Sequence, residues 1–223
     1  GEFVIQGQSV GTPNTMLNLL KIFDMTLHEG ADSFDGIKKN GPVHVKSLSE
    51  FHTFEDLYEQ YKKLLDYYFD ISVQAQSYSY EVMNKEVSFL FTSILMDDCI
   101  TRKKALLDGG VKILGGTNET YGNINTSDAL YAIKTLVYEQ KKYTLEQLVE
   151  AADHDFAGYE YIQKDLLDAP KYGNDHTACD ELANDLYEFV AKGIRQRGID
   201  AGMGYYLIVI SNNQTNTDWG HKT

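Results

Sequence analysis

The chain has 223 residues, a formal net charge of −13 at neutral pH and 43% apolar residues. This apolar fraction supports a packed core and argues against disorder. The acidic balance argues against nucleic acid and an anionic membrane surface as partners, because both need a basic face. No apolar run approaches the roughly 20 residues of a membrane span. Two widely separated cysteines and the lack of a secretory signal pattern predict a cytoplasmic protein.

The first 50 residues predict one apolar helix between two loops. Thr12 and Pro13 form a helix start, with Thr12 as the N-cap. Apolar residues at helical spacing extend this helix to about His28, and Gly30 ends it. Residues 31–50 are polar and rich in turn formers, which predicts a surface loop.

Two further helices are expected in the next stretch. Thr53 and Asp56 resemble a capping box, and no helix breaker follows for about 30 residues. The sequence therefore predicts a long helix from Thr53, with its tyrosines packed inward. Residues 89–104 predict a second helix, in which Cys99 is a small core residue, because the neighbouring carboxylates disfavour a reactive thiolate.

The second half alternates turns and helices. Val111–Leu114 predicts a short strand, and the Gly- and Asn-rich stretch after it predicts a loop. Tyr205–Ile210 is the clearest strand, and its continuous apolar run predicts burial on both faces. The tail after it is polar and irregular. The expected helices in this half cover residues 128–139, 144–153, 156–168 and 179–197, the second opened by a capping box at Thr144 and Gln147.

Two strings of residues are less generic than these elements. The first begins at Gly115–Asn118 and continues through Tyr121-Gly122 to Asn125–Leu130. The second runs from Pro170–Asp175 through Asp180 to Asn184. In this order and at this separation they resemble the middle of a glycyl radical enzyme of the pyruvate formate-lyase type. The resemblance extends over nearly the whole chain, including Leu27–Gly30, Thr53-Phe54 and Asp97–Ile100.

The resemblance implies a ten-stranded α/β barrel, of which this chain would be a partial piece, mostly α with a few short strands. We expect one fragment over 1–223, helical over 12–108, with the Gly/Asn-rich loop, helices and strand over 111–223. The whole enzyme would use a cysteine thiyl radical on a small polar substrate, as a dehydratase or as a C–C lyase of the formate acetyltransferase kind. The resemblance implies no directly bound cofactor; a separate radical S-adenosylmethionine activating enzyme would install the glycyl radical.

Glu2 is the candidate catalytic residue. Many family members carry a Gly-Cys-x-Glu string, and a cysteine before Gly1 would make Glu2 its acid or base. The alternative is that Gly1-Glu2-Phe3 is a cloning remnant. The family's Gly-x-x-Pro-Asp-Gly-Arg string and its radical glycine loop do not occur in the sequence. We therefore expect the isolated chain to be inactive.

Thr12, Asn14 and Asn18 are the candidate substrate-binding residues. In the resembling family the segment just after the cysteine loop enters the substrate pocket. A helix N-terminus there would offer free N–H groups to a polar or anionic group. The alternative is that Thr12 is a plain cap and the two asparagines are simply polar.

Other patterns favour structural roles. Asp153-His154-Asp155 is typical of a solvated helix end rather than a metal site. Exposure of the apolar strand Tyr205–Ile210 in an isolated fragment would favour self-association. A rival hypothesis for the whole chain is a non-catalytic helical interaction module or degenerate relative.

Overall fold

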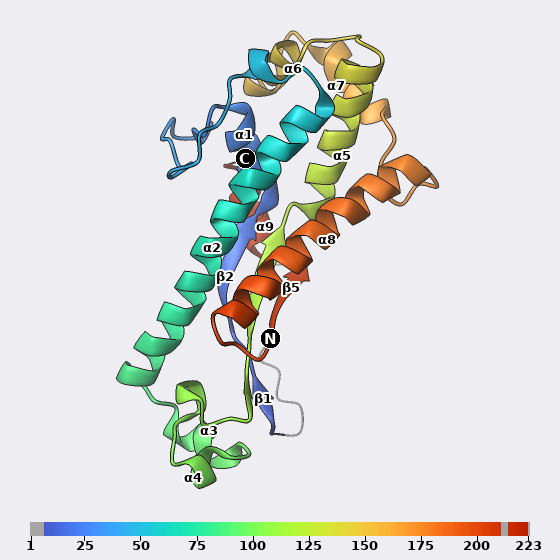
Figure 1. The fold of residues 1–223 in the computed structure, drawn as a ribbon. Coiled ribbons are helices and arrows are strands. Elements are labelled where there is room, and N and C mark those ends of the chain that lie inside the picture. Colours follow the sequence, from blue (N-terminus) through green and yellow to red (C-terminus); the bar gives the residue numbers. More distant parts are fainter. Residues whose placement is uncertain (1–6, 211–213, 223) are drawn as a thin grey trace. The chain divides into compact units, whose positions relative to one another are not determined.

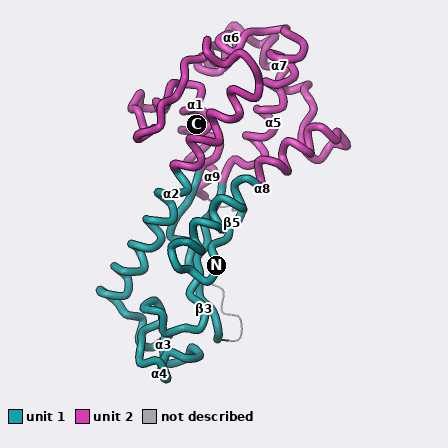
Figure 2. Tube along the Cα trace, viewed as in Figure 1, with its two compact units in different colours: residues 1–17, 68–120, 189–211 teal, residues 18–67, 121–188, 212–223 magenta. Residues whose placement is uncertain are grey.

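A computed structural model describes residues 7–210 and 214–222 (Figure 1). Glu2, the candidate catalytic residue, lies outside the described residues. The chain divides into two compact units (Figure 2). The first unit comprises residues 1–17, 68–120 and 189–211, and the second comprises residues 18–67, 121–188 and 212–223.

Five short strands and a larger set of helices make up the described chain. The strands are β1 (Ser9–Val10), β2 (Pro13–Asn18), β3 (Ile113–Leu114), β4 (Gly116–Tyr121) and β5 (Tyr206–Ile210). The helices are α1 (Leu19–Leu27), α2 (Phe54–Glu86), α3 (Leu90–Leu95), α4 (Cys99–Arg102), α5 (Asn123–Ile133), α6 (Leu145–Asp153), α7 (Glu160–Asp168), α8 (Thr177–Asp200) and α9 (Gln214–Gly220). Short 3₁₀ turns, η1 (Leu48–Glu50) and η2 (Leu106–Asp108), and a π-helical stretch, η3 (Lys134–Glu139), complete the set.

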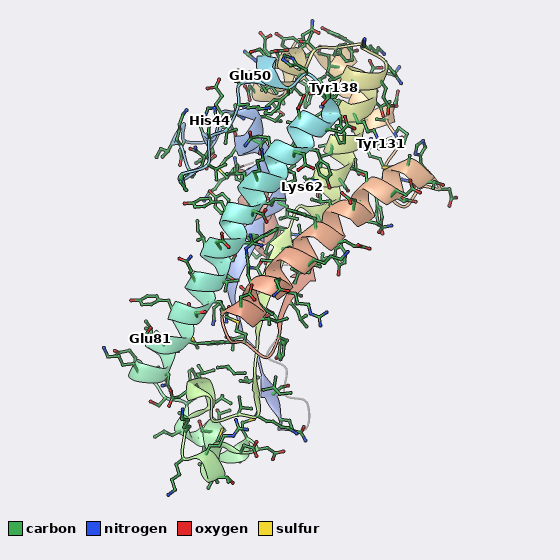
Figure 3. The ribbon with its side chains drawn as sticks, viewed as in Figure 1. His44, Glu50, Lys62, Glu81, Tyr131 and Tyr138 are labelled. Atoms are coloured by element: carbon green, nitrogen blue, oxygen red, sulfur yellow. The ribbon has the colours of Figure 1, made fainter. Side chains whose placement is uncertain are left out.

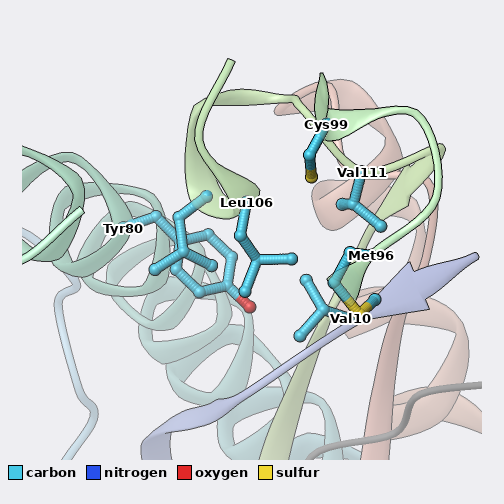
Figure 4. Packing of buried hydrophobic residues seen from close by; sticks show 7 residues of the cluster. Val10, Tyr80, Met96, Cys99, Leu106 and Val111 are labelled. Carbon is cyan, nitrogen blue, oxygen red and sulfur yellow. The ribbon is translucent and has the colours of Figure 1, made fainter. Parts of the chain in front are cut away.

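The first unit is built on two small sheets. One pairs β1 with β3 in parallel, and the other has the order β2–β4–β5. β4 and β5 run parallel, in a register from Gly116 opposite Tyr206 to Thr120 opposite Ile210. An apolar cluster lies beside the β1–β3 pair and contains Val10, Tyr80, Met96, Cys99, Leu106, Leu107 and Val111 (Figure 4). Cys99 is buried as predicted, and this burial raises the pKa of its thiol although the nearby Arg102 charge opposes the shift.

The predicted helix from Thr12 to His28 is wrong in its first half. Residues 13–18 form β2, and the helix α1 begins at Leu19. Along β2, Thr15 and Leu17 are buried whereas Met16 between them is 48% exposed, which is the two-residue period of a strand. Pro13 is the first residue of the strand, a position where its missing N–H does little harm.

The predicted Gly/Asn-rich loop after residue 114 is also wrong. Residues 116–121 form β4, the middle strand of its sheet. The glycines serve close packing here: a Cβ on Gly115 would lie 2.3 Å from the Tyr205 ring, and one on Gly116 would lie 2.9 Å from the Tyr206 ring. The absent side chains let two tyrosines approach the strand, a role that composition does not distinguish from turn formation.

Several other boundaries differ from the predicted ones. The expected helix 89–104 is divided into α3 and α4, with Asp98 at a positive φ of 71° between them. The helix expected from 128 begins at Asn123, and the one expected from 156 begins at Glu160, because Phe156 and Gly158 both have positive φ. The tail, expected to be irregular, contains α9.

The predicted burial of the last strand on both faces is wrong for the chain as it stands. Tyr206 is fully buried, but Leu207 is 46% exposed and Ile210 is 59% exposed. β5 is at one end of the sheet order, with β4 as its neighbour among the described strands. The apolar run therefore forms an edge strand with exposed apolar side chains.

Both predicted capping boxes are confirmed. The Asp56 N–H donates to the Thr53 Oγ1 at 3.1 Å and the Thr53 N–H donates to the Asp56 carboxylate at 3.0 Å. Thr144 and Gln147 exchange the same two bonds at 3.2 and 2.9 Å. These local signals fix the starts of α2 and α6, since each pair satisfies two N–H groups at a helix N-terminus.

The second unit is helical. α1 packs against α5, and α6 packs against α7 and η1. Tyr138, labelled in Figure 3, donates its hydroxyl to the Phe51 carbonyl at 3.2 Å. Next to it, the Ser47 N–H donates to the Glu50 carboxylate at 2.9 Å and closes the η1 turn. Among the described residues, no helix has the length and apolarity that crossing a membrane requires.

Candidate functional site

Two of the three predicted substrate-binding residues lie at the start of β2 in the first unit. The Asn14 side-chain amide donates to the Thr12 Oγ1 at 2.7 Å. The Asn14 N–H donates to the Gln76 side chain at 3.2 Å, and the Gln76 amide donates back to the Thr12 carbonyl at 3.2 Å. The Thr12 N–H donates to the Tyr80 hydroxyl at 3.0 Å, and that hydroxyl donates to the Gly115 carbonyl at 2.6 Å.

These hydrogen bonds give Thr12 and Asn14 a structural role. Gln76 and Tyr80 are buried residues of α2 and hold the backbone of β2 at the two ends of the Thr12–Asn14 segment. Because Thr12 precedes a strand, it does not cap a helix, and the predicted free N–H groups of a helix N-terminus are not at this position. A direct substrate contact by Thr12 or Asn14 stays a prediction.

Asn18 is the N-cap of α1 in the second unit. Its side-chain oxygen accepts the Lys21 N–H at 3.1 Å, which is the role that the sequence had assigned to Thr12. Gly122, with a positive φ of 71°, lies close by: a Cβ there would be 3.1 Å from the Leu20 nitrogen and 3.3 Å from the Asn18 side-chain oxygen. Gly122 in the first string thus allows close packing against the start of α1.

A buried polar network in the first unit was not predicted. Asn118 is fully buried and its amide nitrogen lies 2.8 Å from the Thr15 Oγ1, 2.9 Å from the Ser72 Oγ and 3.3 Å from the Tyr206 hydroxyl. Thr15 and Tyr206 share a further hydrogen bond of 2.5 Å. Burial raises the pKa of Tyr206, so its hydroxyl stays protonated and can donate.

This network joins β2, α2, β4 and β5 through one asparagine. The Asn118 Oδ1 has no hydrogen-bond partner among the described residues, although such buried acceptors are nearly always paired. The sequence signal was available, because Asn118 belongs to the Gly115–Asn118 string. Its role could not be derived, since Thr15 and Tyr206 lie about a hundred residues away on either side.

The second unit contains a cavity of about 530 Å³. α1, α5 and α6 supply most of its wall, and Ser33, Phe156 and Leu166 complete it. The cavity is largely apolar, with side chains that include Leu20, Phe23, Ile133, Leu148, Val149 and Phe156. This volume and lining are typical of small-molecule sites, which combine apolar walls with a few polar groups.

Charged side chains gather on one side of this cavity. The His28 ring contacts Asp24 through Nδ1 at 3.1 Å and Asp153 through Nε2 at 3.1 Å. Asp24 also accepts from Lys21 at 3.0 Å and from the Ser33 hydroxyl at 2.8 Å. Lys21 continues to Asp32 at 2.9 Å. The result is a chain of alternating charges between α1, the following loop and the C-terminal end of α6.

The contacts set the protonation states. The hydrogen bond with Asp24 outweighs burial and raises the pKa of His28 to about 9, so its ring is cationic at neutral pH. Burial opposes ionisation of Asp24, but hydrogen bonds from His28, Lys21 and Ser33 prevail and lower the pKa of its carboxyl. The i,i+4 spacing of Asp24 and His28 is visible in the sequence. Asp153 lies 125 residues from His28, so its part in the cluster depends on the fold.

Metal-binding and thiol chemistry find little support in the described residues. No group of three His, Cys, Asp or Glu side chains among them is arranged to hold a metal ion. His154 of the Asp153–Asp155 stretch places its Nδ1 2.8 Å from the Glu150 carbonyl of its own helix. Cys179 is buried, and burial raises the pKa of its thiol, so the reactive thiolate is disfavoured.

A family model and several known proteins match most of this chain. The model of a family described as pyruvate formate lyase-like matches residues 2–215. The chain is 31% identical over 172 residues to trans-4-hydroxy-L-proline dehydratase of Clostridioides difficile, which covers 77% of this chain and 22% of that protein. It is 28% identical over 220 residues to the probable dehydratase YbiW of Escherichia coli (strain K12), which covers 95% of this chain and 27% of that protein.

A solved structure shares the fold. The structure described as 1,2-propanediol dehydration in Roseburia inulinivorans superimposes with a TM-score of 0.84 at 26% sequence identity. The alignment covers 97% of this chain and 28% of that chain. The chain therefore spans about a quarter of the length of the proteins that it matches.

Proposed function

The chain belongs to the pyruvate formate lyase-like family of glycyl radical enzymes, and we propose that it forms part of a dehydratase that removes water from a small hydroxylated substrate. The predicted fold class, a mostly helical piece of a larger α/β barrel with a few short strands, is confirmed. The observation that supports a dehydratase over a C–C lyase is the superposition, over 97% of the chain, on the structure described as catalysing 1,2-propanediol dehydration.

The proposed chemistry follows from the family resemblance. A cysteine thiyl radical takes a hydrogen atom from a substrate carbon. The neighbouring C–O bond then breaks, with one proton delivered to the leaving hydroxyl and one proton given up by the hydroxyl (in a diol) or the amine (in hydroxyproline) that stays beside the radical carbon. The product radical takes the hydrogen atom back from the thiol, so atoms and electrons balance. A separate radical S-adenosylmethionine enzyme would create the glycyl radical that supplies the thiyl.

Glu2 is the residue that we propose for proton delivery. A carboxylic acid two residues from the thiyl is well placed to protonate a leaving hydroxyl, and it works best when a dry pocket raises its pKa. Phe3, Val4 and Ile5 follow Glu2 and could supply such an apolar wall. The Thr12–Asn14 segment is hydrogen-bonded to Tyr80 and Gln76 of α2. It would then hold β2, a strand that follows Glu2 in the chain, in position.

The test uses a full-length protein that contains this chain, activated without oxygen by its radical S-adenosylmethionine enzyme. Turnover is measured with 1,2-propanediol and trans-4-hydroxy-L-proline, and the radical is quantified by electron paramagnetic resonance. We expect dehydration of a hydroxylated substrate. We expect Glu2→Gln to lower turnover about 10²–10⁴-fold at equal radical content, the usual value of general acid–base help.

Glu29→Gln is the matched control, because Glu29 is an exposed carboxylate at the end of α1. It should leave turnover unchanged. If Glu2→Gln stays within about twofold of the wild type, a range far below the usual effect, Glu2 has no catalytic role. If neither a radical nor a product is formed with wild-type protein, the rival hypothesis of a non-catalytic interaction module replaces the proposal.

A further inference from the structure

The cavity in the second unit has no role in the proposed dehydration. All of its lining residues lie in residues 18–67 and 121–188. α1 packs against α5 and α6 packs against α7. Most of the lining residues stand on these helices, whereas Ser33 and Phe156 lie outside them. Phe23, Ile133, Leu148 and Val149 present side chains that are at least nine-tenths buried. A ligand entering the cavity therefore meets a formed apolar wall and needs to order little of it.

The titratable side chains of the lining favour a cation. They are Asp24, Asp153 and the cationic His28, and Lys21 beside the lining neutralises Asp24. Asp24 is engaged by Lys21, Ser33 and His28 and is only 14% exposed. Asp153 faces His28 with one edge, and its side chain is 44% exposed. An incoming charged group therefore has one accessible carboxylate to pair with.

We propose that this cavity binds a small organic cation with an apolar body, of the alkylammonium class, whose ammonium group pairs with Asp153. The alkyl chain would lie against Phe23, Leu148 and Val149 and lose its contact with water. An organic anion of the same size would bring a carboxylate next to the exposed Asp153, which disfavours it. A neutral alcohol would gain the apolar contact without the ion pair.

The experiment measures binding of three probes with six-carbon chains to the 1–223 chain at pH 7. Hexylammonium, 1-hexanol and hexanoate are titrated separately, and the backbone amide signals of ¹⁵N-labelled protein are followed by nuclear magnetic resonance. Saturable shifts are expected at α1 and α6, with hexylammonium bound most tightly and hexanoate most weakly. The measurement needs no radical, so its result is independent of the proposed dehydration.

Two pairs of variants locate the site. Asp153→Asn should weaken hexylammonium binding about two- to fivefold, as expected for a partly exposed ion pair, and leave 1-hexanol binding unchanged. Asp155→Asn, which makes the same change in net charge two residues away and outside the cavity lining, should have no effect. Ala152→Phe projects a ring from the lining into the cavity and should abolish saturable binding, whereas Ala157→Phe, outside the lining, should not.

The outcomes separate cleanly. The proposal is overturned if no probe gives saturable shifts, if hexanoate binds as tightly as hexylammonium, or if Ala152→Phe binds like the wild type. It is also overturned if Asp153→Asn and Asp155→Asn weaken hexylammonium binding equally, because the effect is then one of net charge. The predicted probe order together with the two variant contrasts supports it.

Discussion

At the scale of single residues, the buried side-chain amide of Asn118 is the centre of a hydrogen-bond network. Its two N–H groups serve three oxygen neighbours, on Thr15, Ser72 and Tyr206. Its own Oδ1 has no partner among the residues that the structure describes. The site is therefore rich in hydrogen bonds and still holds one unsatisfied acceptor, so its contribution to stability is open to direct measurement.

Asn118→Leu should lower the free energy of unfolding by about 1–3 kcal/mol, because buried hydroxyls lose their donor. Asn118→Asp should lower it further at pH 7, because it buries a charge without a cationic partner. Urea denaturation followed by circular dichroism measures both. Asn125→Leu is the control, since Asn125 is an exposed side chain on α5. If Asn118→Leu matches the wild type as closely as the control does, the network is not stabilising.

His28 makes stability depend on pH. Its pKa is about 9 in the folded chain against an ordinary value of 6.5, chiefly because of its hydrogen bond with Asp24. A raised folded pKa means that the contribution is complete below pH 6.5 and is lost as the pH rises through 9. The wild type should therefore lose its stability advantage over His28→Gln between these two values.

Urea denaturation at pH 6, 7.5 and 9.5, values on both sides of the two pKa values, measures this advantage. Asp24→Asn should reduce the pH dependence, because it removes the partner with the largest effect on the pKa of His28. An advantage that stays constant from pH 6 to 9.5, across the range where the ring would titrate, contradicts the assignment of His28 as the cation of this cluster.

At the scale of elements, β5 is the exposed feature. Leu207 and Ile210 present apolar side chains on an edge strand, where unpaired backbone groups invite another chain. We expect the 1–223 chain to self-associate through β5, and Leu207→Lys to reduce the association. Light scattering at about 100 μM, a concentration at which exposed edges associate, is the measurement. Leu167→Lys changes a leucine on α7 that is even more exposed than Leu207 and should leave the association intact. A clean monomer before substitution contradicts the prediction.

Local sequence signals were sufficient to predict the start of a helix where residues close together in the sequence determine it. The Thr53–Asp56 and Thr144–Gln147 boxes predict the starts of α2 and α6 because cap and partner are three residues apart. β2 and β4 were missed because strand pairing and contacts with the distant residues Gln76 and Tyr206 decide their conformation.

The sites divide in the same way. The sequence located Thr12, Asn14 and Asn18, but the structure gives Asn18 the capping role and ties the other two to α2. The cavity could not be predicted, since its wall combines residues of α1 with residues of α5 and α6 that lie more than a hundred positions away. No short sequence motif indicates a cavity wall that is built from residues so far apart in the sequence.

At the scale of the whole molecule, the chain corresponds to about a quarter of its relatives. We expect the 1–223 polypeptide, mixed with a radical S-adenosylmethionine activating enzyme, to give no glycyl doublet in electron paramagnetic resonance. The reason is that none of its 18 glycines stands in an Arg-Val-x-Gly-Tyr type of loop. A full-length protein treated in parallel is the positive control, and a doublet on the short polypeptide contradicts the expectation.

The β2–β4–β5 sheet also has a consequence for the order of events during synthesis. Its strands come from residues 13–18, 116–121 and 206–210. Each strand can therefore pair with the next one only after that strand has left the ribosome. At about 5–20 residues per second, roughly 10–40 s separate the emergence of β2 from that of β5. Between the emergence of β4 and that of β5, about 4–17 s at the same rate, one edge of β4, with Gly116 and two buried threonines, has no neighbouring strand. The growing chain is therefore more prone to aggregation at this stage than after β5 has emerged.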